Sequence, residues 1–113
     1  MEDCLFCKII NGEIPSQKVF ENDMVYAFSD IDPQAPVHIL IIPKVHAASI
    51  LDMEGRQEYL TAMFDAAAAI AREKGLGDKG FRLVVNTGDE GGQTVHHLHL
   101  HLLGGRPMEW PPG

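Results

Sequence analysis

The sequence predicts an α+β fold in which a five-stranded, mainly antiparallel sheet carries a short N-terminal helix and one long helix. Apolar residues recur every three or four positions over residues 53–75, which is the period of a helix, and every second position over residues 96–103, which is the period of a strand. The predicted order is one helix, three strands, the long helix and two strands. Such grouping favours α+β over an alternating α/β arrangement.

The N-terminal half supplies the short helix and three strands. CLFCKIING, residues 4–12, spaces its large apolar residues almost helically and ends in Asn-Gly, a common helix stop. SQKVFEN and MVYAFSD, residues 16–22 and 24–30, predict a hairpin because two runs suited to strands flank a polar turn. VHILIIP, residues 37–43, is nearly all apolar, which is typical of a central strand buried on both faces.

The second half supplies the long helix and two further strands. Within residues 53–75 the apolar positions fall at i, i+3, i+4 and i+7, and Gly75 is suited to the C-terminal cap. GFRLVVN, residues 80–86, and HHLHLHLL, residues 96–103, predict the last two strands, and residues 104–113 form a tail that completes a single domain over residues 1–113. The helix face expected to contact the sheet consists of Leu60, Met63, Phe64, Ala67, Ile70 and Ala71.

Composition excludes several classes of function. The 113 residues fit one compact domain, and no apolar run reaches the roughly 18 residues that span a bilayer, so we expect no membrane contact. The net charge of −7 opposes binding to a nucleic-acid backbone but leaves a single phosphate ester open. The first residues, MEDCLFCKII, are acidic where a secretory signal is basic, and we expect a cytoplasmic protein.

Cys4 and Cys7 form a C-x-x-C pair. A structural disulfide is disfavoured in a reducing cytoplasm, and the strand that precedes a redox C-x-x-C motif has no room here. Metal binding is the more natural interpretation, and it requires two further ligands. The alternative is a pair of small buried thiols.

Four of the six histidines lie in VHHLHLHLLGGR, residues 95–106. In a strand, His97, His99 and His101 share one face, whereas His96, for which we expect no function, shares the other with three leucines. Three imidazoles in a row suit metal binding, proton transfer or nucleophilic attack. The glycine-rich stretch that precedes them, residues 86–94, is expected to offer N–H groups to an anion.

These motifs resemble the histidine triad (HIT) superfamily. HLHLHLL, residues 97–103, matches its pattern of three histidines separated by apolar residues. CLFCKIINGEIPS, FSDIDPQAPVHILIIPKVH and VVNTGDEGGQTVHHLHLHLLGGRPMEWPPG resemble its nucleotide-binding (Hint) phosphoramidase branch, so the similarity covers nearly the whole chain. It implies a HIT-like fold and hydrolysis of purine nucleoside 5′-phosphoramidates, as by an adenosine 5′-monophosphoramidase, to an amine and a nucleoside monophosphate.

The resemblance implies a catalytic set of His38, His97, His99 and His101. His99 would be the nucleophile that forms a covalent nucleotidyl-histidine through Nε2, while its Nδ1–H is held by the carbonyl of His97. His101 would donate to a phosphate oxygen. His38 would relay a proton, with a structural hydrogen bond to the triad as the open alternative, and this chemistry requires no cofactor.

The resemblance also implies the substrate contacts. Asp30 matches a carboxylate that accepts both ribose hydroxyls, Gln93 and Thr94 would share the phosphate charge with nearby N–H groups, and Asn86 would lie near the phosphate or ribose. An apolar pocket would hold the base, although a core role for Leu40 is equally open. The complete predicted set is Leu5, Phe6, Ile9, Phe28, Asp30, Ile31, Leu40, Asn86, Gly92, Gln93, Thr94, Val95, His99, His101 and Trp110.

The same resemblance also implies a zinc site and a homodimer. Some relatives carry zinc on residues that match Cys4, Cys7, His46 and His97, and because others function without the cysteines, this zinc would be structural. Family members are homodimers joined sheet edge to sheet edge. The tail, residues 104–113, would then reach toward the partner, where Trp110 would shape the leaving-group side of the pocket.

Two other functions stay open at this point. One is hydrolysis of dinucleoside polyphosphates, as in the sister branch of the superfamily. The other is a nucleotide-binding regulatory or scaffold role in which hydrolysis is incidental.

Overall fold

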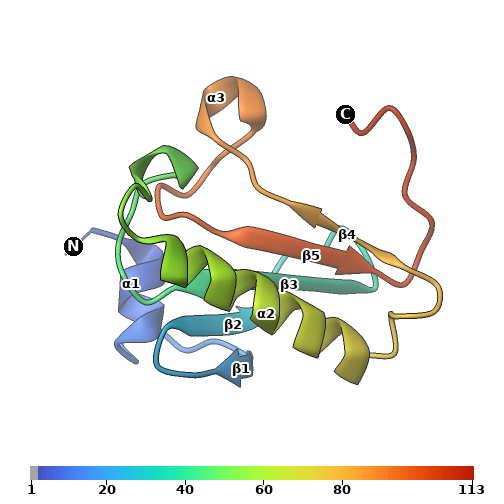
Figure 1. Cartoon of the computed structure of the whole chain (residues 1–113), viewed down its shortest axis with the longest axis horizontal. Coiled ribbons are helices and arrows are strands. Elements are labelled where there is room, and N and C mark those ends of the chain that lie inside the picture. Colours follow the sequence, from blue (N-terminus) through green and yellow to red (C-terminus); the bar gives the residue numbers. More distant parts are fainter. Residues whose placement is uncertain (1–2) are drawn as a thin grey trace.

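Five strands form one antiparallel sheet in the computed structural model, which describes residues 3–113 (Figure 1). They follow one another across the sheet in the order β1-β2-β3-β5-β4, and every neighbouring pair is antiparallel. The predicted α+β class is therefore confirmed. The strands are β1 (Lys18–Glu21), β2 (Val25–Ser29), β3 (Val37–Pro43), β4 (Phe81–Val84) and β5 (Leu100–Gly104).

The two predicted helices are present as α1 (Leu5–Ile10) and α2 (Gln57–Glu73). The long helix begins four residues later than predicted because Ser49 caps a 3₁₀ turn, η1 (Ile50–Asp52), and the left-handed Gly55 (φ 78°) follows this turn. A further short helix, α3 (Gly88–Gly91), was not predicted. η1 and α3 contain only three and four residues, about one helical turn each, so no hydrophobic period can repeat within them and periodicity does not reveal them.

Strand β3 is buried on both faces, as predicted, and divides the apolar interior into two layers. Ile39 and Ile41 face the layer shared with α2, whereas Leu40 and Ile42 face the layer shared with Phe6 and Ile9 of α1. Figure 1 shows α2 lying across one face of the sheet. Leu98, Leu100 and Leu102 join the α2 layer, so the histidines between them belong to the opposite side.

The predicted apolar face of α2 is correct except at Phe64. Met63, Ala67, Ile70 and Ala71 are buried against the sheet, but Phe64 is 51% exposed. A position one residue beyond Met63 lies about 100° further around the helix, which carries the Phe64 ring off the buried stripe.

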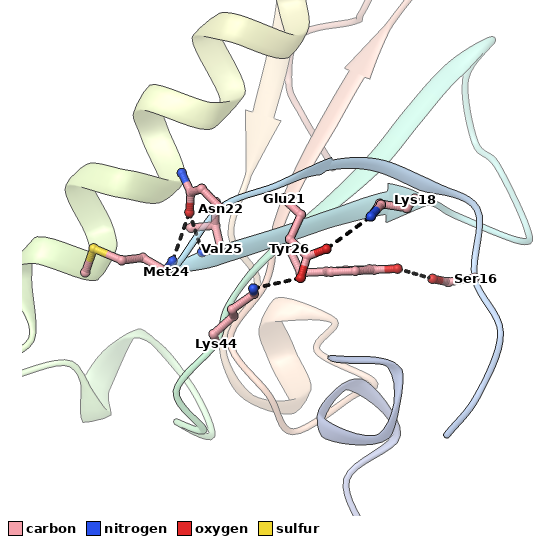
Figure 2. A network of polar contacts seen from close by, with 8 residues as sticks. All are labelled: Ser16, Lys18, Glu21, Asn22, Met24, Val25, Tyr26 and Lys44. Carbon is pink, nitrogen blue, oxygen red and sulfur yellow. Dashed lines mark hydrogen bonds and ion pairs between the residues drawn. The ribbon is translucent and has the colours of Figure 1, made fainter. Parts of the chain in front are cut away.

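The β1–β2 hairpin closes one edge of the sheet with polar contacts (Figure 2). The Asn22 side-chain oxygen accepts the N–H groups of Met24 and Val25, each at 2.9 Å, which fixes the turn. Glu21 binds Lys44 at 2.7 Å and Lys18 at 3.2 Å. Exposed ion pairs of this kind add little stability, but charged side chains on an edge strand disfavour pairing with another chain.

The opposite edge, β4, is apolar by comparison. Phe81 is 40% exposed at its beginning, Leu83 is half-buried, and Val85 is 36% exposed just beyond its end. Within residues 3–113, no helix combines the length and the apolar character required to cross a membrane.

Candidate active site

The three histidines of the triad lie at and just before the beginning of β5. The predicted strand over residues 96–103 is partly wrong, because the ladder starts at Leu100 and the Leu98 N–H donates to the carbonyl of Ala47 at 2.7 Å. The period of two nevertheless persists through Leu98, which is 1% exposed. His96 is exposed, so it does not share the buried face of the leucines as predicted, because the extended ladder does not reach back to it.

His97 turns away from the other two rings of the triad. It is fully buried, and its Nε2–H donates to the carbonyl of Pro43 at 3.0 Å, so the lone pair of the neutral ring is on Nδ1. That nitrogen faces Cys4, Cys7 and His46. Burial lowers the pKa of His97 to about 4, which keeps the ring neutral at neutral pH.

The Cys4, Cys7, His46 and His97 donors converge as metal ligands would. The two Nδ1 atoms are 3.3 Å apart, and the three sulfur–nitrogen contacts measured are 3.3, 3.4 and 3.6 Å. A tetrahedral zinc with bonds of about 2.3 Å to sulfur and about 2.05 Å to nitrogen separates two nitrogens by about 3.3 Å and a sulfur from a nitrogen by about 3.6 Å. The donor set and its spacing therefore fit zinc.

His99 presents one free nitrogen. Its Nδ1 lies 2.7 Å from the carbonyl oxygen of His97, and because a carbonyl only accepts, Nδ1 carries the hydrogen. The lone pair is consequently on Nε2. Phe6 contacts the ring edge to face at 5.2 Å, and burial lowers the pKa of His99, so the ring is neutral.

His38 and His101 form a hydrogen-bonded pair. Nε2 of His38 lies 2.9 Å from Nδ1 of His101 and 3.4 Å from an Asp30 oxygen. Nε2 of His101 is buried and has no partner among the described residues. Burial lowers the pKa of His101 to about 4 and also lowers the pKa of His38, so the pair is neutral at neutral pH.

A cavity of about 300 Å³ opens over His99 and His101 between α1 and the β2–β3 strands. A larger hollow of about 550 Å³ beside the Cys–His cluster shares Leu5, Thr94 and Val95 with it but includes neither of these two rings. The smaller cavity is lined by the predicted Leu5, Phe6, Ile9, Phe28, Asp30, Ile31, Leu40, Thr94, Val95, His99 and His101, and also by Ile14 and Pro15.

Ile14 and Pro15 were not among the predicted site residues. They follow the N-terminal helix in GEIPS, residues 12–16, which is part of a segment that resembles the family. That resemblance could have indicated that both residues belong to the site. Ile14 is half-buried against the α1 layer. An isolated apolar residue of this kind in a connecting segment gives no local pattern that would assign it to a site.

The residues of the glycine-rich loop are used differently from the prediction. The amide of Gln93 donates to the carbonyls of Ala48 and Val95 and accepts the N–H of Gly88, so its side chain braces the loop and has no hydrogen free for a phosphate. The N–H groups of Gly92 and Gln93 donate to carbonyls within the α3 turn. The N–H groups of Gly88, Gly92 and Gln93 are therefore already paired, and Thr94 and Val95 are the loop residues that line the cavity.

Asn86 and Trp110 lie outside this cavity. Asn86 lies against Gly91 and Gly92 beneath the α3 turn. Trp110 is 81% exposed, and its ring centroid is 5.8 Å from the guanidinium of Arg82 on β4. Within one chain, therefore, the tryptophan belongs to the β4 edge.

Comparison with known proteins identifies what this arrangement is similar to. The model of the HIT domain family matches residues 11–108. The chain is 49% identical over 108 residues to purine nucleoside phosphoramidase of Escherichia coli, covering 95% of this chain and 91% of that protein. It is 50% identical over 114 residues to a 14 kDa zinc-binding protein of Brassica juncea, covering 98% and 100%.

A solved structure agrees with these relatives. A HIT family hydrolase of Legionella pneumophila superposes with a TM-score of 0.96 at 54% identity, and the match covers 98% of this chain and 100% of that one.

We predict that the free energy of unfolding falls as the pH is lowered from about 6.5 to about 4. The ordinary histidine pKa is 6.5 and that of folded His101 is about 4, so the unfolded chain binds more protons than the folded chain across this window. The measurement is the urea midpoint at several pH values. His101→Gln should reduce the slope of stability against pH, whereas the matched change His96→Gln at an exposed ring should not. Both variants retain the Cys–His cluster, and equal slopes in the two would contradict the prediction.

Proposed function

Because this chain belongs to the HIT domain family, we propose that it hydrolyses purine nucleoside 5′-phosphoramidates through a covalent nucleotidyl-histidine. The family resemblance inferred from the sequence is confirmed by the match over residues 11–108. The phosphoramidase of Escherichia coli, at 49% identity, supports this substrate class over the dinucleoside polyphosphates of the sister branch.

The orientation of His99 carries this proposal. Its Nδ1–H donates to the His97 carbonyl, so Nε2 keeps the lone pair, and the His99 ring lines the cavity together with the His101 ring. Attack of Nε2 on the α-phosphorus forms a P–N bond to His99 as the bond to the amine breaks. The departing amine takes up one proton from solvent, relayed through the His38–His101 pair, and the water of the second step later returns one proton to solvent. Water then attacks the phosphorus, the P–Nε2 bond breaks, and the nucleoside monophosphate is released.

Charge on the phosphoryl oxygens would be met by hydrogen-bond donors in the cavity. The buried and unpartnered Nε2 of His101 is suited to this role because a donor held in place before reaction stabilises developing negative charge. The Thr94 hydroxyl lines the same cavity. Gln93 would act indirectly, because its side-chain hydrogen bonds to Ala48 and Val95 hold the loop that carries Thr94.

The other end of the cavity suits a purine nucleoside. Asp30 lies at its margin beside His38, where a carboxylate could accept the two ribose hydroxyls. The walls are apolar, and such a surface discriminates poorly between adenine and guanine. The residues proposed to contact the base are Leu5, Phe6, Ile9, Ile14, Phe28, Ile31 and Leu40.

We also propose that Cys4, Cys7, His46 and His97 hold a structural zinc ion, a site that the zinc-binding relative of Brassica juncea supports. The ion would tie α1 to the end of β3 and to the triad segment. Without a cation, burial raises the pKa of Cys7 to about 11, with a further contribution from the Cys4 thiol, so the positive ion would be what favours the thiolates.

We further propose a homodimer joined through the β4 edges. Phe81 and Leu83 on β4, with Val85 just beyond its end, form an edge that is apolar where the β1 edge is charged. Trp110 stands beside the same edge, from which it could reach the partner's leaving-group pocket. The cytoplasmic location stays a prediction from the sequence.

We predict that His99→Ala lowers turnover of adenosine 5′-phosphoramidate by at least about a thousandfold, because it removes the nucleophile. His96→Ala is the matched control and should retain turnover. Mass spectrometry of wild-type protein mixed briefly with a slow substrate should show a nucleotide adduct on His99. Preferential cleavage of a diadenosine polyphosphate, or nucleotide binding without turnover, would contradict the proposed substrate class.

Metal analysis of protein purified without chelator should give about one zinc per chain. The double change Cys4→Ser with Cys7→Ser should abolish binding and lower the melting temperature, while the remaining folded molecules keep most of their turnover. The double change Ser16→Ala with Ser29→Ala, purified in the same way, is the control and should keep its zinc. Fully active and stable wild-type protein that contains no zinc would refute the site.

The proposed dimer should be visible by sedimentation velocity. We expect wild-type protein to sediment as a dimer and Phe81→Glu as a monomer, because a buried unpaired charge is unfavourable at an apolar interface. Lys18→Ala at the opposite edge should leave the dimer intact. A monomeric wild-type protein, or dissociation caused by the β1 change alone, would show that β4 is not the interface.

A further inference from the structure

The direction of the hydrogen bonds around His38 is set by a backbone amide. The Gln34 N–H lies 3.0 Å from Nδ1 of His38. Because an amide N–H can only donate, this Nδ1 carries the lone pair, and neutral His38 must carry its hydrogen on Nε2. The burial that lowers the pKa of His38 keeps it in this neutral form.

The tautomer of His38 determines which ring nitrogen of His101 carries the hydrogen. Nε2–H of His38 is 2.9 Å from Nδ1 of His101, which must therefore accept. The hydrogen of neutral His101 is consequently on Nε2, the buried atom without a partner among the described residues. One directed chain thus runs from Gln34 through both rings and ends at the Nε2–H of His101, a residue whose ring lines the cavity.

The opposite direction would be harmful to the proposed reaction. If the Gln34 amide moved away, His38 could carry its hydrogen on Nδ1 and accept at Nε2 from Nδ1–H of His101. The Nε2 of His101 would then present a lone pair to the phosphoryl oxygens in place of a hydrogen. Asp30, 3.4 Å from Nε2 of His38, also favours the observed direction, but it is the residue proposed to bind the ribose. The Gln34 N–H contact, by comparison, involves no group proposed to bind substrate.

The C-terminal tail is hydrogen-bonded to Gln34, the residue whose N–H contacts His38. Gln34 lies in the exposed turn between β2 and β3, and its carbonyl accepts two hydrogen bonds from Arg106, from Nε at 3.2 Å and from Nη2 at 2.9 Å. The adjacent Gly105 has φ 90°, and a Cβ there would approach the ring of Pro36 to 2.9 Å. The tail therefore lies directly against this turn, and a charged guanidinium holds it with two bonds.

We propose that Arg106 is a positioning residue, which holds the Gln34 amide on His38 and thereby keeps the hydrogen of His101 on Nε2. The catalytic meaning of this inference rests on the proposed function, but the tautomers themselves do not. Arg106 lies outside the cavity lining and would act entirely through Gln34 and His38.

The test is nuclear magnetic resonance of the full chain with histidines labelled by nitrogen-15, at a pH of about 7.5, where neutral rings dominate. Long-range proton–nitrogen correlations distinguish the two neutral tautomers. Wild-type protein should show His38 and His101 protonated on Nε2. Arg106→Ala should give His101 a substantial population protonated on Nδ1, and Arg106→Lys, which retains one donor for the carbonyl, should restore most of the wild-type signal. Arg72→Ala, at an exposed position of α2, is the matched control and should match wild type.

Kinetics complete the test. In Arg106→Ala we expect kcat for adenosine 5′-phosphoramidate to fall about tenfold, as when a stabilising donor is partly lost, with KM changed less than about twofold. Unchanged tautomers in Arg106→Ala would overturn the inference even if kcat falls. If the alanine variant does not fold, wild-type tautomers in a folded Arg106→Gln variant would overturn it equally. Shifted tautomers in a protein whose wild type does not cleave phosphoramidates would refute the proposed function and leave the positioning role supported.

Discussion

Burial of three alternating leucines against α2 is the constraint on which the rest of the site depends. Leu98, Leu100 and Leu102 are each at most 1% exposed, and burying side chains of this size contributes roughly 1.5–3 kcal/mol each. Since successive side chains of an extended chain point to opposite sides, this burial directs His99 and His101 toward the α1 side of the sheet. A slip by one residue would exchange leucines for imidazoles in the core, and the loss of apolar burial strongly disfavours that register.

Each triad ring has one nitrogen held by the protein and the other directed to a task. The Pro43 carbonyl holds His97 so that its lone pair faces the cysteines, and the His97 carbonyl holds His99 so that its lone pair faces the cavity. His38 holds His101 so that its hydrogen is on Nε2, the ring nitrogen without a partner among the described residues. Burial keeps these rings neutral, and neutral imidazole is the form in which the position of one hydrogen decides between donor and acceptor. Three identical side chains thereby acquire three different properties.

The C-terminal tail connects two regions that the sheet keeps apart. Arg106 binds the turn behind His38, and Trp110 lies beside Arg82 on the β4 edge. The two sheet edges also differ, because Lys18, Glu21 and Lys44 make the β1 edge charged. In the proposed dimer, the same short tail would therefore contact the turn that orients its own His38–His101 pair and extend toward the neighbouring subunit's cavity.

The sequence by itself determined the features that depend on local periodicity and on motif order. The α+β class, the central position of β3 and the alternation of leucine and histidine follow from patterns within a few residues, because burial of one face imposes those patterns. Most of the cavity lining was instead implied by the family resemblance. The family resemblance, which the comparisons confirmed, rests on motif order in the same way.

Only the tertiary structure decided how polar groups are used. It gave the Gln93 amide to Ala48 and Val95, began β5 at Leu100, and placed Gln34 between Arg106 and His38. The partners in the His38–His101 and Gln34–Arg106 contacts are 63 and 72 residues apart in the chain. A hydrogen bond requires two specific atoms within about 3 Å at a suitable angle, and no local pattern records which distant atom the fold will bring there.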